Sequence, residues 1–204
     1  PLYSSYERYA LGWIEPTVLD PSEERQEALL SLAEENKAFL IPASEQGSEY
    51  FLLENRQQKG WDTYLPGHGL IVWHIDENKE AWSKNVVNNA LNNPAGHKCI
   101  DIVKADNLAT RETEAGDAFP GTKNVTTGTF SSWRTQKTFT VSDIAEQEST
   151  VAFTLGNKSA DISTTLAKQK NGSIYSINGI RQQNDTKNLP KGIYIRGGKK
   201  VIMH

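Results

Sequence analysis

The stretch FLLENRQQKGWDTYLPGHGLIVWHID, residues 51–76, decides the fold expected of this chain. Two apolar runs flank a polar connection marked by Pro and Gly, which is typical of a β-hairpin or a pair of adjacent strands. The second run ends in Trp73, His74 and Asp76. A buried strand does not need an aromatic ring, an imidazole and a carboxylate at its end, so the stretch indicates a site or the scaffold of one.

Composition limits the class of protein. The length of 204 residues suits one large domain, or one domain with a small appendage. Plentiful Asn, Gln, Ser, Thr and Gly favour a β-rich, loop-rich extracellular protein. A net charge of −3 gives no electrostatic reason to expect nucleic acid or an anionic membrane as partner. Cys99 is the only cysteine, which excludes an internal disulfide, and no apolar run reaches the roughly 18 residues of a membrane span.

The remaining patterns predict a mostly β fold with a few helical segments. Helical spacing predicts an N-terminal helix over residues 2–13, ended by Gly12, and one helical turn near Trp82 within a polar loop over residues 77–93. Residues 28–42 fit a helix or two short strands, and we favour strands because Leu30 and Leu32 alternate. Further strands are expected at residues 50–56, 69–75, 99–105, 137–144 and 150–155.

Two units are expected along the chain. Residues 1–157 form the main unit, and residues 158–204 form a linker, over 162–172, and a small β-module. The last run of the module is a hairpin candidate with its turn at Gly197 and Gly198. A unit of about 40 residues is close to the lower size limit for independent folding, so we expect it to dock on the main unit or add strands to it.

The histidines do not form a zinc pair. His68 and His74 stand six residues apart, which in a strand is roughly 20 Å, too far for two ligands at about 2 Å from one ion. We interpret His74 and Asp76 as hydrogen-bonded groups at the end of a buried strand, and His68 as a turn residue that contacts a neighbouring loop or a substrate. The zinc-peptidase motif His-Glu-x-x-His is absent from the sequence.

The other candidate residues also favour structural roles. Glu54 and Arg56 share a strand face, which predicts a semi-buried ion pair or a hydrogen-bond network. Together with His68, His74 and Asp76 they are our candidates for scaffold or cleft residues, and none is a candidate catalytic residue. We interpret Cys99 as a buried, inert thiol.

Oxygen ligands gather after the second strand. Asp76 and Asn78 open a loop rich in asparagine, and carboxylate and amide oxygens are the ligands that Ca²⁺ prefers. The spacing does not match an EF-hand, so a solvated polar loop is the default interpretation. We name Asp76 and Asn78 as the candidate calcium ligands.

The order of several motifs resembles one family. SSYERYALGWIEP, EYFLLENRQQKGWDTYLPGHGLIVWHID, IDIVKADN and GDAFPG follow one another as in the immune inhibitor A-type secreted zinc metallopeptidases, peptidase family M-six. The resemblance covers about residues 2–155 and implies the C-terminal, β-rich part of the peptidase unit. It also implies that the zinc ligands and the catalytic Glu lie upstream of Pro1, so no catalytic residue carries over to this chain.

The tail resembles a different group. SIYSINGIRQ and LPKGIYIRGGKKVIMH look like the short C-terminal β-modules of exported proteins of Bacteroidetes-type bacteria, some of which are type IX sorting signals. A sorting signal and a surface module both fit these residues. A sequence that opens at Pro1, without Met or a signal peptide, leads us to expect a piece of a longer bacterial protein that is secreted or held at the cell surface.

The resemblance implies a function and partners. The expected function is the non-catalytic part of a zinc metalloendopeptidase, inactive alone, with the upstream catalytic half and a peptide or protein substrate as partners. An extracellular β-rich module that binds peptide or glycan through Trp61, Trp73, Trp82 or Trp133 is one alternative. A structural domain that packs on a separate catalytic chain through the segment 2–13 is the other.

Overall fold

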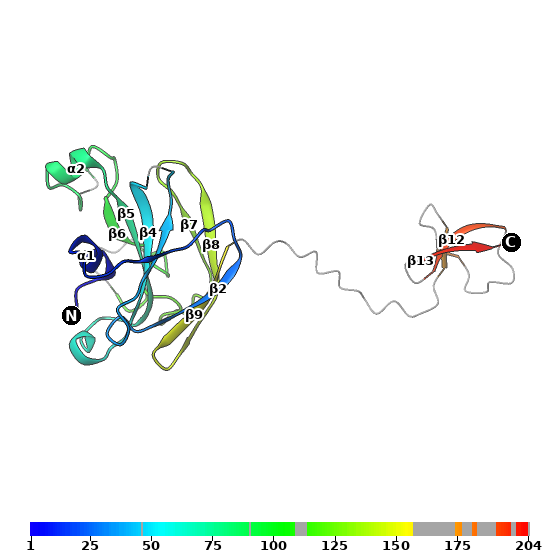
Figure 1. Cartoon of the computed structure of the whole chain (residues 1–204), viewed down its shortest axis with the longest axis horizontal. Helices are drawn as coiled ribbons and strands as arrows, with labels where there is room; N and C mark the ends of the chain where they lie inside the picture. Colours follow the sequence, from blue (N-terminus) through cyan, green and yellow to red (C-terminus); the bar gives the residue numbers. More distant parts are fainter. Residues whose placement is uncertain are drawn as a thin grey trace. The chain divides into compact units, whose positions relative to one another are not determined.

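The computed structural model describes residues 1–156, apart from Gln46, Ala90 and 109–113, and in the C-terminal part residues 174–176, 181–182, 191–196 and 199–203. The chain divides into two compact units, Pro1–Lys158 and Ser159–His204 (Figure 1). Both are built from β-strands, and the described residues add two short α-helices and one 3₁₀ turn, Gly60–Asp62. The expectation of a mostly β fold is confirmed.

The central sheet of the first unit, sheet A, is built on the segment that dominates the sequence. Its strand order is β1(Thr17–Val18), β3(Phe39–Pro42), β4(Glu49–Arg56), β5(Gly69–Asp76) and β6(Ile100–Ile102). β4 and β5 pair antiparallel over their full length, from Glu49 opposite Asp76 to Arg56 opposite Gly69. Every residue of β4 is buried, because both faces of the sheet are covered.

Sheet B lies against one face of sheet A. Its order is β2(Arg25–Leu30), β9(Thr150–Leu155), β8(Thr138–Gln147) and β7(Gly128–Ser131), all antiparallel. The main core cluster takes Phe51 and Val72 from sheet A and Phe139 and Phe153 from sheet B. The unit is therefore a β-sandwich whose core fills the space between the two sheets.

The opposite face of sheet A carries the helix α1(Ser5–Ala10), which Figure 1 shows beside β4 and β5. Ser4 caps this helix and forms a capping box with Glu7. Gly12 has a φ of +69° just after the helix, as expected of a residue that ends it. The helix is shorter than predicted, because the Ser4 cap starts it three residues after Leu2.

Other elements differ in detail from the prediction. Residues 28–42 do contain two strands, but β2 and β3 belong to different sheets. The turn near Trp82 is the helix α2(Lys79–Ser83), capped by Asn78. β1 and β7 were not predicted, because two and four residues are too short to show an alternating pattern.

In the second unit, four strands form one antiparallel sheet in the order β11(Arg181–Gln182), β10(Ile174–Ser176), β12(Gly192–Arg196), β13(Lys199–Met203). β12 and β13 pair as a hairpin with Arg196 opposite Lys199. The predicted linker, 162–172, and the predicted turn at Gly197 and Gly198 lie outside the described residues. In the described part of the chain, neither helix has the length and apolar character needed to cross a membrane.

Candidate functional site

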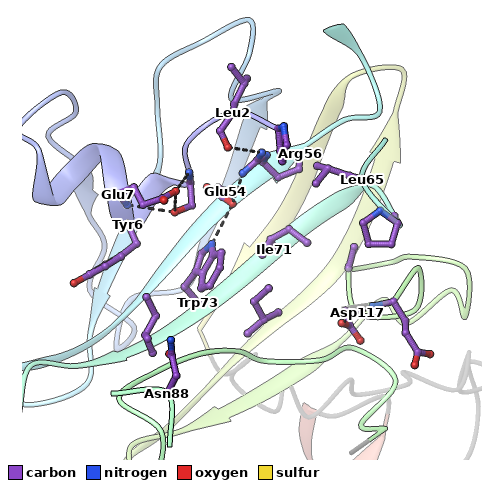
Figure 2. A pocket seen from close by; sticks show the side chains of 18 of the residues that line it. Leu2, Tyr6, Glu7, Glu54, Arg56, Leu65, Ile71, Trp73, Asn88 and Asp117 are labelled. Atoms are coloured by element: carbon purple, nitrogen blue, oxygen red, sulfur yellow. Dashed lines mark hydrogen bonds and ion pairs between the residues drawn. The ribbon is translucent and has the colours of Figure 1, made fainter. Parts of the chain in front are cut away.

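The outer face of sheet A holds a pocket of about 600 Å³ beside α1, here called the sheet A pocket (Figure 2). Its floor comes from β4, β5 and β6, and its walls from the N-terminal segment, the loop after α2 and the loops 65–67 and 114–118. The apolar lining includes Leu2, Tyr6, Leu65, Pro66, Ile71, Trp73, Trp82, Val87, Ile100, Ile102 and Ala118. Mostly apolar pockets of this size with a few polar groups are typical ligand sites.

An ion-pair network closes one end of the pocket. Arg56 donates to both carboxylate oxygens of Asp62 at 2.8 and 2.7 Å, and its Nη1 lies 3.2 Å from Glu54 Oε1. Burial alone would raise the pKa of Asp62, but the Arg56 hydrogen bond lowers it overall. The network shows the ion pair expected between Glu54 and Arg56, with Asp62 as a third member that sequence reasoning missed.

Glu54 also binds groups outside its own strand. Its Oε1 accepts a hydrogen bond of 3.1 Å from the Trp73 indole (Figure 2). Its Oε2 accepts one from the backbone N–H of Ser5. Glu54 is fully buried and Arg56 is nearly so. These bonds fix α1 and the Trp73 ring against the sheet, so this end of the pocket has fixed walls.

Asp117 lines the pocket at its other end (Figure 2). Its Oδ2 accepts from the backbone N–H of Glu114 at 2.9 Å and lies 3.3 Å from Lys104 Nζ. Its Oδ1 is buried and has no hydrogen-bond partner among the described residues. Since a buried acceptor without a partner costs about 1–3 kcal/mol, this atom marks a place where a ligand could contribute a donor.

A second polar cluster lies where sheet A meets the β7–β8 connection. Glu49, fully buried on β4, accepts hydrogen bonds from the Ser132 hydroxyl at 2.7 Å and the Trp133 backbone N–H at 2.6 Å. Its Oε1 lies 2.9 Å from His74 Nε2. Burial would raise the pKa of Glu49, but these hydrogen bonds lower it overall. Burial also lowers the pKa of His74 to about 4, so the imidazole is neutral at pH 7 and donates its Nε2–H to the Glu49 carboxylate.

Asp76 anchors the same connection. Its Oδ1 accepts two hydrogen bonds from Arg134, at 3.2 and 2.6 Å, and its Oδ2 lies 2.9 Å from His97 Nε2. The rings of His74 and His97 stack on opposite sides of the Trp133 indole, with centroid distances of 3.4 and 4.0 Å. His74 and Asp76 are thus hydrogen-bonded groups at the end of a buried strand, as the sequence indicated.

One group of metal-ligand type occurs among the described residues. Ligand atoms of Asp76, His97 and Cys99 lie within 4.8 Å of one another. Cys99 is fully buried, which raises the pKa of its thiol and keeps it protonated, as predicted for an inert cysteine. The Asp76 oxygens already bind Arg134 and His97, so these contacts account for the cluster without an ion.

The other predicted residues are dispersed. His68 Nδ1 lies 2.8 Å from Glu146 Oε1 on β8, so His68 and His74 have different partners. The side chain of Asn78 accepts from the Ala81 N–H as the cap of α2. Calcium binding at Asp76 and Asn78 stays a prediction. The contacts of His97, Ser132 and Arg134 were missed, since their partners are 21 to 85 residues away in sequence.

Aromatic side chains are exposed around the N-terminal segment. Tyr3, Trp13 and Trp61 line one surface hollow and are 54%, 55% and 79% exposed, respectively. The rings of Tyr3 and Trp13 meet edge to face at 5.3 Å. We call these three residues the aromatic patch. Exposed apolar patches of this kind mark interaction surfaces more often than scattered single residues do.

Comparisons with known proteins give no assignment: no family model matches the chain, and neither a curated protein nor a solved structure matches it significantly.

Proposed function

We propose that residues 1–157 are the non-catalytic, C-terminal part of a secreted bacterial zinc metalloendopeptidase. The motif order that resembles the immune inhibitor A-type family supports this proposal. The observation of the structure that supports it most is the aromatic patch of Tyr3, Trp13 and Trp61. A domain that works with a catalytic half needs an exposed apolar surface to receive it, and the patch has that character.

In this proposal the β-sandwich acts as a scaffold. The zinc ion and the general base belong to the upstream half, where zinc would supply an activated water for hydrolysis of a peptide bond. The residues of this chain position that half through the aromatic patch and form part of the wall of the substrate cleft. The acids and histidines described above serve this role by holding the strands and loops in place.

The test uses the complete protein encoded with its upstream region. We expect zinc-dependent hydrolysis of casein that 1,10-phenanthroline abolishes, and no hydrolysis by the purified 204-residue chain. Replacing Trp13 and Trp61 by Ser in the complete protein should reduce casein hydrolysis at least tenfold. Tyr64→Ser is the matched control, because Tyr64 is 96% exposed but does not line the hollow of the patch. Hydrolysis by the isolated chain, or equal effects of the two changes, would overturn the proposal.

A second candidate function is an extracellular module that binds peptide or glycan. Trp73 and Trp82 favour it, because both half-buried rings line the sheet A pocket. Trp133 does not contribute, since its ring is stacked between two imidazoles. This candidate needs no catalytic partner, and direct binding to the isolated chain tests it.

A further inference from the structure

We propose that the sheet A pocket binds a peptide segment through a lysine or arginine side chain. The proposal rests on the binding-module candidate and is independent of the peptidase role. Three features of the pocket carry it: an apolar channel of suitable size, a surplus of carboxylates, and a buried oxygen without a partner.

The apolar lining suits the stem of a long basic side chain. Ile71 and Trp73 of β5 form the floor together with Ile100 and Ile102 of β6, and Trp82 adds a wall. Lysine and arginine bury three or four methylene groups along such surfaces while their charged ends reach polar groups.

The charged groups of the pocket are mostly acids. Among the described side chains of the lining, four are carboxylates, Glu7, Glu54, Glu114 and Asp117, and one is a cation, Arg56, a difference of −3. Two ion-pair partners lie outside the lining: Asp62, which pairs with Arg56, and Lys104, which pairs with Asp117. Counting both leaves the charge difference unchanged. The pocket therefore attracts a cation and repels an anion.

The arrangement of the charged groups indicates which end of the pocket binds the cation of the ligand. Glu54 pairs with Arg56 and accepts hydrogen bonds from Trp73 and Ser5. Both of its carboxylate oxygens therefore already have partners at this end of the pocket. At the other end Glu114 is exposed, while its backbone N–H donates to the buried Asp117. Asp117 Oδ2 already pairs with Lys104, but its Oδ1 has no hydrogen-bond partner among the described residues. An ammonium or guanidinium group that enters beside Glu114 therefore meets this oxygen and the Glu114 carboxylate. The ligand's cation belongs at this end.

The test is a titration of the full chain with two peptides, acetyl-Gly-Ala-Lys-Ala-Gly-amide and the same peptide with norleucine in place of lysine. We expect the lysine peptide to bind at least tenfold more tightly, with an advantage that shrinks as salt is added. In ¹H–¹⁵N spectra the indole N–H signals of Trp73 and Trp82 should shift, and that of Trp133 should not.

Substitutions of single acids test which carboxylates of the pocket bind the lysine side chain of the peptide. Glu114→Gln changes an exposed residue and should reduce the preference for lysine at least threefold without loss of folding. Asp117→Asn should reduce it further, with the spectrum of the free protein checking its fold. Asp101→Asn is the control, since Asp101 is a half-exposed acid on β6 that pairs with Lys98 and is absent from the pocket lining. Equal affinity for the two peptides, no binding of either, or a shift of Trp133 alone would overturn the proposal.

Discussion

The imidazole of His74 lies face to face with the indole of Trp133, with ring centroids 3.4 Å apart and planes inclined by 9°. His74 belongs to β5 of sheet A, whereas Trp133 belongs to the connection between β7 and β8 of sheet B. The contact, together with the hydrogen bonds of Glu49, joins the two sheets at one end of the sandwich.

The stability of the protein should fall as the pH is lowered from about 6.5 to 4. Burial lowers the pKa of His74 to about 4, so over this range the unfolded chain binds a proton that the folded chain does not. Stability rises with pH wherever the unfolded state binds more protons, and the full effect of this one group is about 3 kcal/mol. Urea denaturation at pH 7, 5.5 and 4.5 measures it. His74→Gln keeps an N–H donor for Glu49 and should flatten the slope in this range; an unchanged slope in that variant would contradict the assignment to His74.

Replacement of Glu49 by Gln should cost about 2–4 kcal/mol of unfolding free energy. The carboxylate accepts from four donors: His74, Ser132 and the backbone N–H groups of Trp133 and Arg134. A Gln side chain offers one oxygen and places its NH₂ against donors. Glu45→Gln is the matched control, because the Glu45 side chain is 90% exposed. Similar urea midpoints for the two variants would show that the buried cluster contributes little.

Asp76 and Arg134 should show strong energetic coupling. Arg134 donates two charge-assisted hydrogen bonds to one oxygen of Asp76, and Asp76 is buried, so the double-mutant cycle of Asp76→Asn and Arg134→Met should give about 1–3 kcal/mol. The exposed pair Glu80 and Lys84, at 2.5 Å, is the comparison and should give a coupling near zero. Thermal or urea unfolding of the four proteins in each cycle provides the values, and equal coupling in the two pairs would refute the prediction.

Gly69→Ala should destabilise the protein far more than Gly96→Ala. Both glycines have positive φ, +121° and +77°, which an alanine adopts only with strain. A Cβ at Gly69 would also collide with the carbonyl oxygen of Phe119, whereas a Cβ at Gly96 would meet open space. We expect a loss of more than about 2 kcal/mol for Gly69→Ala and about 1 kcal/mol for Gly96→Ala. Equal losses of unfolding free energy in the two variants would mean that the strain of a positive φ explains both of them, and would contradict the predicted collision at Gly69.

The sequence predicts local features of this fold well. The apolar runs ending at Arg56 and Asp76 give β4 and β5 almost to the residue, because both strands are long and bounded by turn residues. Strand parity also places Glu54 and Arg56 together, since they are two residues apart on one face. Short strands such as β7 carry too few residues to show a period.

The long-range contacts could not be predicted in the same way. His97 shows no partner in its own neighbourhood, and its bond to Asp76 exists only because β6 pairs with β5. Asp62 likewise joins Arg56 only when the connection after β4 folds back on the sheet. Both depend on tertiary packing, which a single sequence does not encode in its periodicity.

The pairing of β2 with β9 has a consequence for synthesis of the protein. Leu30 stands opposite Thr150 and Arg25 opposite Leu155, so the first strand of sheet B bonds to the last one along the chain. During synthesis, residues 25–30 have no partner strand until about 125 further residues have left the ribosome. Pairings between strands so far apart in the sequence slow folding, and they leave β2 unpaired and able to form non-native contacts. A chain that stops before Thr150 lacks the whole of β9, so Leu29, which is fully buried in the complete unit, would lose its partner strand.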